Sequence, residues 1–182
     1  MRNLANFALF QLGWFACVYS AAAGHMWLGP GAVLAIVVLH LLFVAEREMR
    51  RRELVFILLV GLIGMLADTG LGALGATRYP TSESVWTALV VPPWITALWV
   101  LFATLPYHSL GWLKGRPVLA MIFGALGGPL TFLAGVRIGA VDAGDSLMLT
   151  YGSLAIEYAL VTPLLLFLAQ PPNSARQRAS RR

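Results

Sequence analysis

Two acids that interrupt long apolar stretches, Asp68 and Glu157, are the residues in this sequence best placed to do chemistry. A charged residue at the centre of a membrane-spanning helix costs about 2.5–3.5 kcal/mol, so it is expected to face protein, water or a partner. Glu157 lies roughly 15 Å and Asp68 roughly 9 Å from the nearer end of its stretch. Arg137 follows another apolar stretch, residues 117–136, and lies on the same side of the membrane, so its side chain can reach either acid. We therefore predict a pocket of Asp68, Arg137 and Glu157 that binds a ligand or a proton.

The same three residues also have a purely structural interpretation. A buried ion pair, or a protonated acid bonded to a backbone carbonyl, would tether helices without performing any reaction. Exchanging Asp68 for Asn or Glu157 for Gln separates the two interpretations. Further candidates for the pocket are Thr131, Tyr151 and Ser153.

A second polar layer, formed by Gln11 and His40, is predicted near the other end of the helices. Both residues lie roughly 8–11 Å from the membrane surface, and we interpret them as a hydrogen bond between neighbouring helices. His25 and His108 fall near opposite ends of the protein in depth, so the three histidines are not expected to form one metal centre. No two histidines have the helical spacing of metal ligands, so the sequence predicts no metal site and no cofactor.

Helix-breaking residues fall within two of the apolar stretches: Pro92 and Pro93, and Gly127, Gly128 and Pro129. A proline inside a helix frees a backbone carbonyl and kinks the helix. Broken helices build the substrate site of many transporters. Tolerated kinks are the alternative, because Pro and Gly are common in spanning helices.

The composition indicates which elements carry these residues, since 59% of the 182 residues are apolar and only 12% are charged. A soluble domain is nearer half apolar and a quarter charged, and a disordered chain is poorer still in apolar residues. A spanning helix needs about 20 apolar residues. Six such stretches are present: 4–23, 28–45, 54–74, 86–105, 117–136 and 147–169.

We therefore predict an all-α integral membrane protein with six transmembrane helices. They form a single domain over residues 1–170, followed by a basic, disordered cytoplasmic tail over 171–182. The first stretch also resembles a signal peptide with a cleavage site at residues 20–23. Its length, and the presence of Gln11, Trp14 and Tyr19, favour an uncleaved helix.

The positions of the basic residues predict the orientation. With the N-terminus in the cytoplasm, every Lys and Arg except Arg78 and Arg137 lies on the cytoplasmic side. The positive-inside rule favours this arrangement, which places both termini in the cytoplasm. It also explains the net charge of +5 without a nucleic-acid partner. The charged segment 46–53 is interpreted as a solvated interfacial turn, with a contact to anionic lipid as the alternative.

Scattered motifs resemble one family. They are Asn6-x-x-x-Phe10-Gln11-x-x-Trp14-Phe15-Ala16-Cys17-Val18, Asp68 among glycines, Pro93-Trp94 through Leu98-Trp99 to Thr104-Leu105, and Gly127-Gly128-Pro129. The pattern resembles an uncharacterised bacterial inner-membrane family, filed as domain of unknown function number 2878, over nearly the whole chain apart from the tail. The family has no established activity, so the resemblance implies no catalytic residue. Its members often neighbour genes for fatty-acid modification, which implies a lipid-linked accessory role.

Three functions remain open at this point. The first is an accessory or lipid-handling protein of the inner membrane that presents a lipid or another apolar molecule to a membrane-protein partner. The second is a small proton-coupled transporter with Glu157 as the protonatable group. The third is an intramembrane lipid-modifying enzyme that uses an acid as general base.

Overall fold

The structure, a computed structural model, describes residues 1–79 and 90–170. Its elements in chain order are α1 (Arg2–Ala22), α2 (Leu28–Leu39), η1 (His40–Val44), α3 (Arg50–Ala73), β1 (Thr77–Arg78), α5 (Pro93–Phe102), η2 (Gly111–Leu113), α6 (Pro117–Ile138), β2 (Asp142–Ala143) and α7 (Leu147–Leu168). The predicted tail 171–182 and the start of the predicted fourth helix, 86–89, lie outside the described residues. The prediction of an all-helical chain is confirmed, apart from one pair of two-residue strands.

Four of the described helices, α1, α3, α6 and α7, are long and apolar enough to cross a membrane. The other two apolar helices, Leu28–Val44 and Pro93–Phe102, are shorter. Helix length therefore supports a membrane protein with four spanning helices in the described part of the chain. The count of six remains a prediction.

Proline and glycine shape α5 and α6 in different ways. Pro93 occupies the first turn of α5, where its missing N–H costs nothing, and residues 90–92 before it are not helical, so α5 begins at Pro93. The predicted break at Pro92 and Pro93 stays a prediction, because residues 86–89 of the predicted stretch lie outside the described residues. In α6, Gly127, Gly128 and Pro129 do lie inside the helix, which continues to Ile138 and ends at a left-handed glycine.

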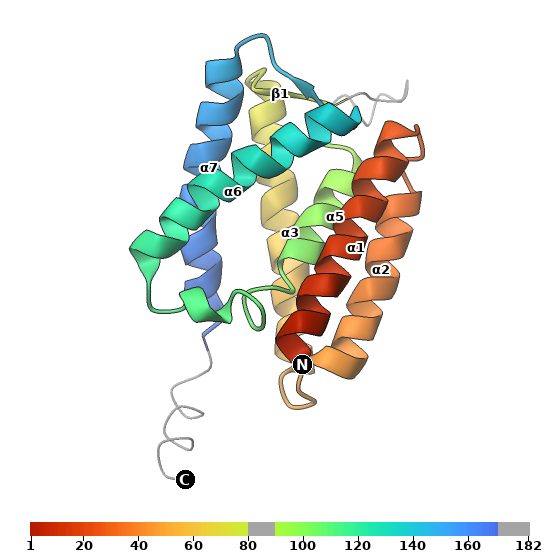
Figure 1. Cartoon of the computed structure of the whole chain (residues 1–182), viewed down its shortest axis with the longest axis vertical. Coiled ribbons are helices and arrows are strands. Elements are labelled where there is room, and N and C mark those ends of the chain that lie inside the picture. Colours follow the sequence, from red (N-terminus) through yellow and green to blue (C-terminus); the bar gives the residue numbers. More distant parts are fainter. Residues whose placement is uncertain (80–89, 171–182) are drawn as a thin grey trace.

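The helices form two groups (Figure 1). In the first group, α1 packs on α2 and α5, and α3 packs on α5. In the second, α6 crosses obliquely over α7, and the two helices pack chiefly on each other. α1 begins and α7 ends at the same end of the molecule, which we call the inner end; the opposite, outer end carries β1 and β2 (Figure 1).

Small residues let α6 and α7 approach closely. A Cβ added at Gly124 would lie 2.1 Å from the backbone oxygen of Tyr158, and one added at Gly128 would lie 2.5 Å from its ring. Neither position can hold a side chain without moving α7. The Tyr158 ring is therefore pressed against α6 and directed toward the first helix group.

Short contacts join the two groups at both ends. At the outer end, β1 pairs with β2, and the hydroxyl of Thr150 on α7 donates to the carbonyl of Ala76. At the inner end, Arg52 donates to the carbonyl of Gln170 at 2.6 Å and Lys114 donates to that of Ala169 at 3.0 Å. Cations at the carboxyl end of a helix are favourable, so these two side chains anchor α7.

Candidate functional site

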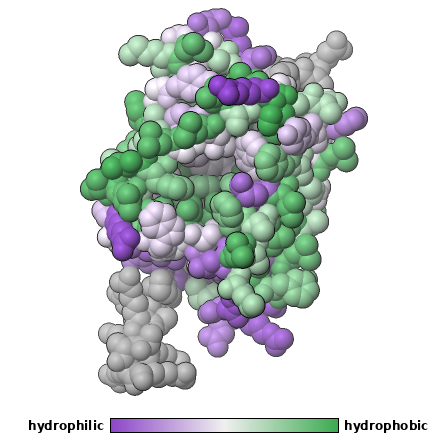
Figure 2. Space-filling model, in the orientation of Figure 1, coloured by the Kyte–Doolittle hydropathy of each residue, from purple (hydrophilic) through white to green (hydrophobic). Residues whose placement is uncertain are grey.

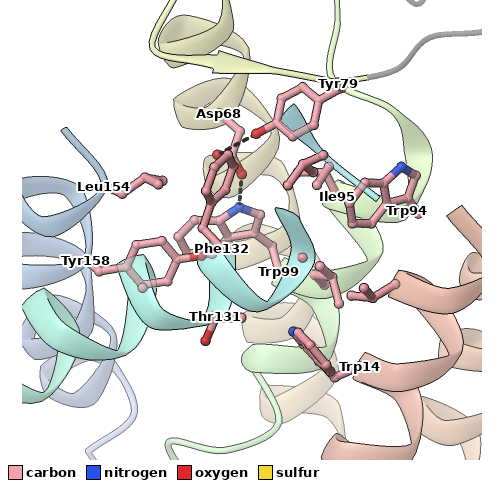
Figure 3. Close-up of a pocket in the computed structure, with 15 residues that line it drawn as sticks. Trp14, Asp68, Tyr79, Trp94, Ile95, Trp99, Thr131, Phe132, Leu154 and Tyr158 are labelled. Atoms are coloured by element: carbon pink, nitrogen blue, oxygen red, sulfur yellow. Dashed lines mark hydrogen bonds between the residues drawn. The ribbon is translucent and has the colours of Figure 1, made fainter. Parts of the chain in front are cut away.

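Asp68 lies on the buried face of α3, near its outer end, and is 5% exposed. Its two carboxylate oxygens accept different hydrogen bonds, one from the indole N–H of Trp99 at 2.6 Å and one from the hydroxyl of Tyr79 at 3.3 Å (Figure 3). Burial, and then the neighbouring Asp68 carboxylate, hold the pKa of Tyr79 well above its usual value. The phenol therefore stays protonated and remains a donor.

Glu157 approaches the same region from α7. It is close enough to Asp68 for the two carboxyl groups to interact electrostatically. Both of its carboxyl oxygens are buried, and among the described residues neither has a hydrogen-bond partner. The next residue, Tyr158, stacks on Trp99 with ring centroids 5.2 Å apart, so the aromatic rings form a bridge between α7 and α5.

Arg137 does not complete the predicted trio. Its residue is exposed at the end of α6, and within residues 1–79 and 90–170 it forms no ion pair with either acid. The ion pair found at this end of the molecule joins Arg78 and Asp145. The structure thus brings Asp68 and Glu157 together but leaves Arg137 outside, because the last turn of α6 turns its side chain toward the surface.

A cavity of about 610 Å³ opens between the two helix groups. Its walls come mainly from α1, α5, α6 and α7 and include Phe7, Trp14, Phe102 and Tyr158. A smaller space of about 60 Å³ adjoins it and reaches Asp68 and Tyr79. Six residues line both spaces: Trp14, Leu98, Trp99, Gly128, Thr131 and Tyr158. We call the two together the interhelical cavity.

The interhelical cavity is apolar along most of its length and polar at a few points. Trp14 and Thr131 face its middle from opposite walls (Figure 3). Two lining residues, Trp14 and Thr162, have buried polar atoms without a hydrogen-bond partner in the described part of the chain. The face toward the viewer is hollowed beneath α6, amid largely hydrophobic surface (Figure 2).

A second polar cluster lies at the inner end, and we call it the histidine–glutamate cluster. One oxygen of Glu53 lies 2.9 Å from Nε2 of His40 and 3.1 Å from Nε2 of His108. Asn6 joins the cluster through Nδ2, 3.4 Å from Nδ1 of His40. Ser109 donates from both its backbone N–H and its hydroxyl to the Asn6 carbonyl, at 3.2 and 2.6 Å.

The predicted pairing of Gln11 with His40 is not present among the described residues, since Asn6 and Glu53 occupy that place. Asn6 and Gln11 are five residues apart, so they point about 140° apart around α1. The sequence places Glu53 in a solvated turn, but the residue is 2% exposed. The signal that could have found it is the buried stripe of α3: Glu53, Phe56, Ile57, Val60, Gly61, Gly64 and Asp68.

Together, the fold and the two polar regions define an all-helical protein of membrane type with buried acids at both ends of one helix. The family comparison agrees with this class. The chain belongs to the family described as "Protein of unknown function (DUF2878)", whose model matches residues 3–164. Comparison with curated proteins and with solved structures gives no match.

Proposed function

We propose that this protein binds one lipid-like amphiphile in the interhelical cavity and serves as an accessory component of membrane-lipid handling. The observation that carries the proposal is the cavity itself. Its volume of about 610 Å³ lies within the range of pockets that bury a small ligand, roughly 300–1,000 Å³.

Access from the bilayer favours a lipid over a water-soluble ligand. Several lining residues are also exposed on the apolar outer surface, among them Leu4, Phe7, Trp112 and Phe123. In a membrane these side chains would contact acyl chains directly. A chain could therefore enter sideways, between α1 and α6, without crossing the aqueous phase.

The polar atoms of the cavity support a ligand with a polar group as well as an acyl chain. The indole N–H of Trp14 is a donor without a partner among the described residues, and it would be satisfied by a ligand oxygen. The Asp68 carboxylate already accepts two hydrogen bonds from the protein. Asp68 would then hold Trp99 and Tyr79 in place at the end of the site, and the ligand oxygen would be placed at Trp14.

A glycine in the cavity wall permits a direct test. Gly127 lines the cavity, and a Cβ added there meets nothing within 4 Å. Gly127→Leu should therefore fill the space without disturbing the helices. Native mass spectrometry of the purified protein should show a bound lipid adduct in the wild type. In Gly127→Leu the adduct should fall by about five-fold or more, because the new side chain replaces several methylene groups of the ligand.

Gly152→Leu is the matched control. Gly152 lies on α7 outside the cavity lining, and a Cβ added there also meets nothing within 4 Å. The control should retain the adduct of the wild type. A wild-type protein without any bound lipid, or equal adducts in both variants, would refute the proposal.

A second candidate, proton-coupled transport, is favoured by one observation: the buried, unpartnered carboxyl group of Glu157 in the described part of the chain. Such a group would take up and release a proton as its surroundings change. Reconstitution in liposomes with a pH-sensitive dye tests it. Proton flux driven by an imposed gradient should be present in the wild type and lost in Glu157→Gln.

The proposal places the protein in a bacterial inner membrane with six spans and both termini in the cytoplasm. The distribution of basic residues supports this orientation, since only Arg78 and Arg137 fall on the other side. A membrane-protein partner that receives the lipid is part of the proposal. A periplasmic reporter that is active when fused after Arg182 would contradict the orientation.

A further inference from the structure

The histidine–glutamate cluster has no role in the proposed lipid site, yet three of its side chains are arranged like metal ligands. The nearest nitrogens of His40 and His108 and a carboxylate oxygen of Glu53 all lie within 4.8 Å of one another. They come from three different elements: the start of η1, the first turn of α3 and the loop after α5.

We propose that His40, Glu53 and His108 bind one divalent transition-metal ion of the zinc or ferrous-iron class. Imidazole nitrogen with a carboxylate is a ligand set that these ions prefer. Ligands about 2.0–2.1 Å from a tetrahedral ion lie about 3.4 Å from one another. The two nitrogen–oxygen separations of 2.9 and 3.1 Å need small outward shifts to admit the ion, and the two imidazole nitrogens, at most 4.8 Å apart, need an inward shift of about 1 Å.

Burial and charge also suit an ion. The side chains of His40 and Glu53 are 1% and 3% exposed, and that of His108 is 10% exposed. A buried carboxylate compensates part of a double positive charge, and neutral imidazoles supply the remaining electron pairs. Three protein ligands leave a fourth position for water or substrate, as in catalytic rather than structural zinc sites.

The Asn6 amide influences which ring nitrogen of His40 carries the proton, and therefore which nitrogen is free to bind a metal ion. Its amide donates to the carbonyl of Thr104 at 3.1 Å and accepts from Ser109, so its NH₂ group faces Nδ1 of His40. Without metal, this orientation keeps the His40 proton on Nε2, directed at Glu53. A metal on Nε2 moves that proton to Nδ1, where it opposes the amide. Metal binding therefore replaces the hydrogen bond between Asn6 and His40, the longest that Asn6 makes at 3.4 Å, with a contact between two donors.

Metal content of the full chain tests the proposal. The protein is purified in detergent with a tag that lacks histidine, incubated with zinc chloride, freed of unbound ion and analysed by mass spectrometry for zinc per chain. The wild type should hold about one equivalent, and His40→Gln and His108→Gln should each lower it by about five-fold or more. His25→Gln is the matched control, since His25 is exposed and outside the cluster, and it should bind as the wild type does.

A wild type that holds no stoichiometric zinc, or cluster variants that hold as much as the wild type, would overturn the proposal. Where the variants do not fold, Co²⁺ titration of the wild type replaces them. A saturable visible absorption that zinc displaces supports imidazole and carboxylate ligation. Its absence overturns the site. Neither result depends on lipid binding in the interhelical cavity.

Discussion

Glu53 and Asp68 occupy opposite ends of the buried face of α3, fifteen residues and roughly 22 Å apart. Both are almost completely buried, at 2% and 5% exposure. Glu53 meets two imidazoles, which can carry a proton or a metal ion. Asp68 meets an indole and a phenol, which donate hydrogen bonds but bring no positive charge.

The comparison shows how one kind of side chain, on one helix face, is held in two different ways. At the inner end the carboxylate is surrounded by bases, so the region can become neutral or positive. At the outer end the second acid Glu157 is close enough to interact with Asp68 electrostatically, and no described cation forms an ion pair with either acid. The inner end is therefore suited to a metal ion, and the outer end to fixing donors at the end of an apolar cavity.

Removing the inner carboxylate should have the largest effect on stability. In Glu53→Ala two buried imidazoles lose their acceptor, and the loss of one partner of a buried pair costs about 3–5 kcal/mol. Denaturant unfolding in detergent micelles measures the change. Glu48→Ala, an exposed position in the preceding turn, is the control and should unfold like the wild type. Equal unfolding free energies of the two variants would contradict the assigned role of Glu53.

The second largest effect is expected at Asn6. Asn6→Leu leaves Ser109 N–H without an acceptor and the carbonyl of Thr104 without a donor, which costs about 2–4 kcal/mol in total. Gln11→Leu, on the same helix, should change the free energy of unfolding by less than about 0.5 kcal/mol. The same unfolding assay compares them. A larger loss of unfolding free energy in Gln11→Leu than in Asn6→Leu would support the predicted pairing of Gln11 with His40.

Asp68→Asn should destabilise less than Glu53→Ala. Asparagine keeps one oxygen acceptor but places an NH₂ group against either the Trp99 or the Tyr79 donor, so one hydrogen bond is lost, at about 1–3 kcal/mol. Near-ultraviolet circular dichroism should report a changed Trp99 environment. Asp142→Asn, exposed at the same end, is the control. If Asp68→Asn has the spectrum and stability of the wild type, Asp68 does not hold Trp99 and Tyr79 in place as described.

Glu157→Gln should have the smallest effect, below about 1 kcal/mol, because no described residue donates to this carboxyl group. Thermal unfolding of Glu157→Gln and of Asp68→Asn, measured side by side, checks the contrast. A loss for Glu157→Gln as large as that for Asp68→Asn would mean that Glu157 has a structural partner.

The sequence predicts much of the fold because apolar length is a strong signal. The predicted stretches 4–23, 54–74, 117–136 and 147–169 correspond to α1, α3, α6 and α7. The stretch 86–105 is less well predicted, since an apolar run does not show where Pro93 will start a helix. Depth along the helices predicts Asp68 and Glu157 near one level, and the two carboxyl groups are close enough to interact electrostatically.

The depth of a residue along its helix does not predict which way its side chain points around the helix. It also does not predict where a loop folds back against other helices. Arg137 has the right depth but points outward, and Gln11 has nearly the right depth but lies on another face of α1. His108 reaches the cluster because the loop after α5 folds back against α1 and α3. The residue pattern of a single helix cannot predict this contact, because it depends on how three separate elements pack together.

The turn His40–Val44 winds as a π-helix, which holds about one residue more than an α-helical turn. The wider winding is closed by Ala45, whose N–H donates to the carbonyl of His40, and Arg50 donates to the carbonyl of Leu42. Such a turn is equivalent to a one-residue insertion in an ordinary helix. Deleting one residue between 41 and 44 would rotate the chain after it by about 100° relative to His40. The meeting of His40 with Glu53 therefore depends on the number of residues in this turn as much as on their identity.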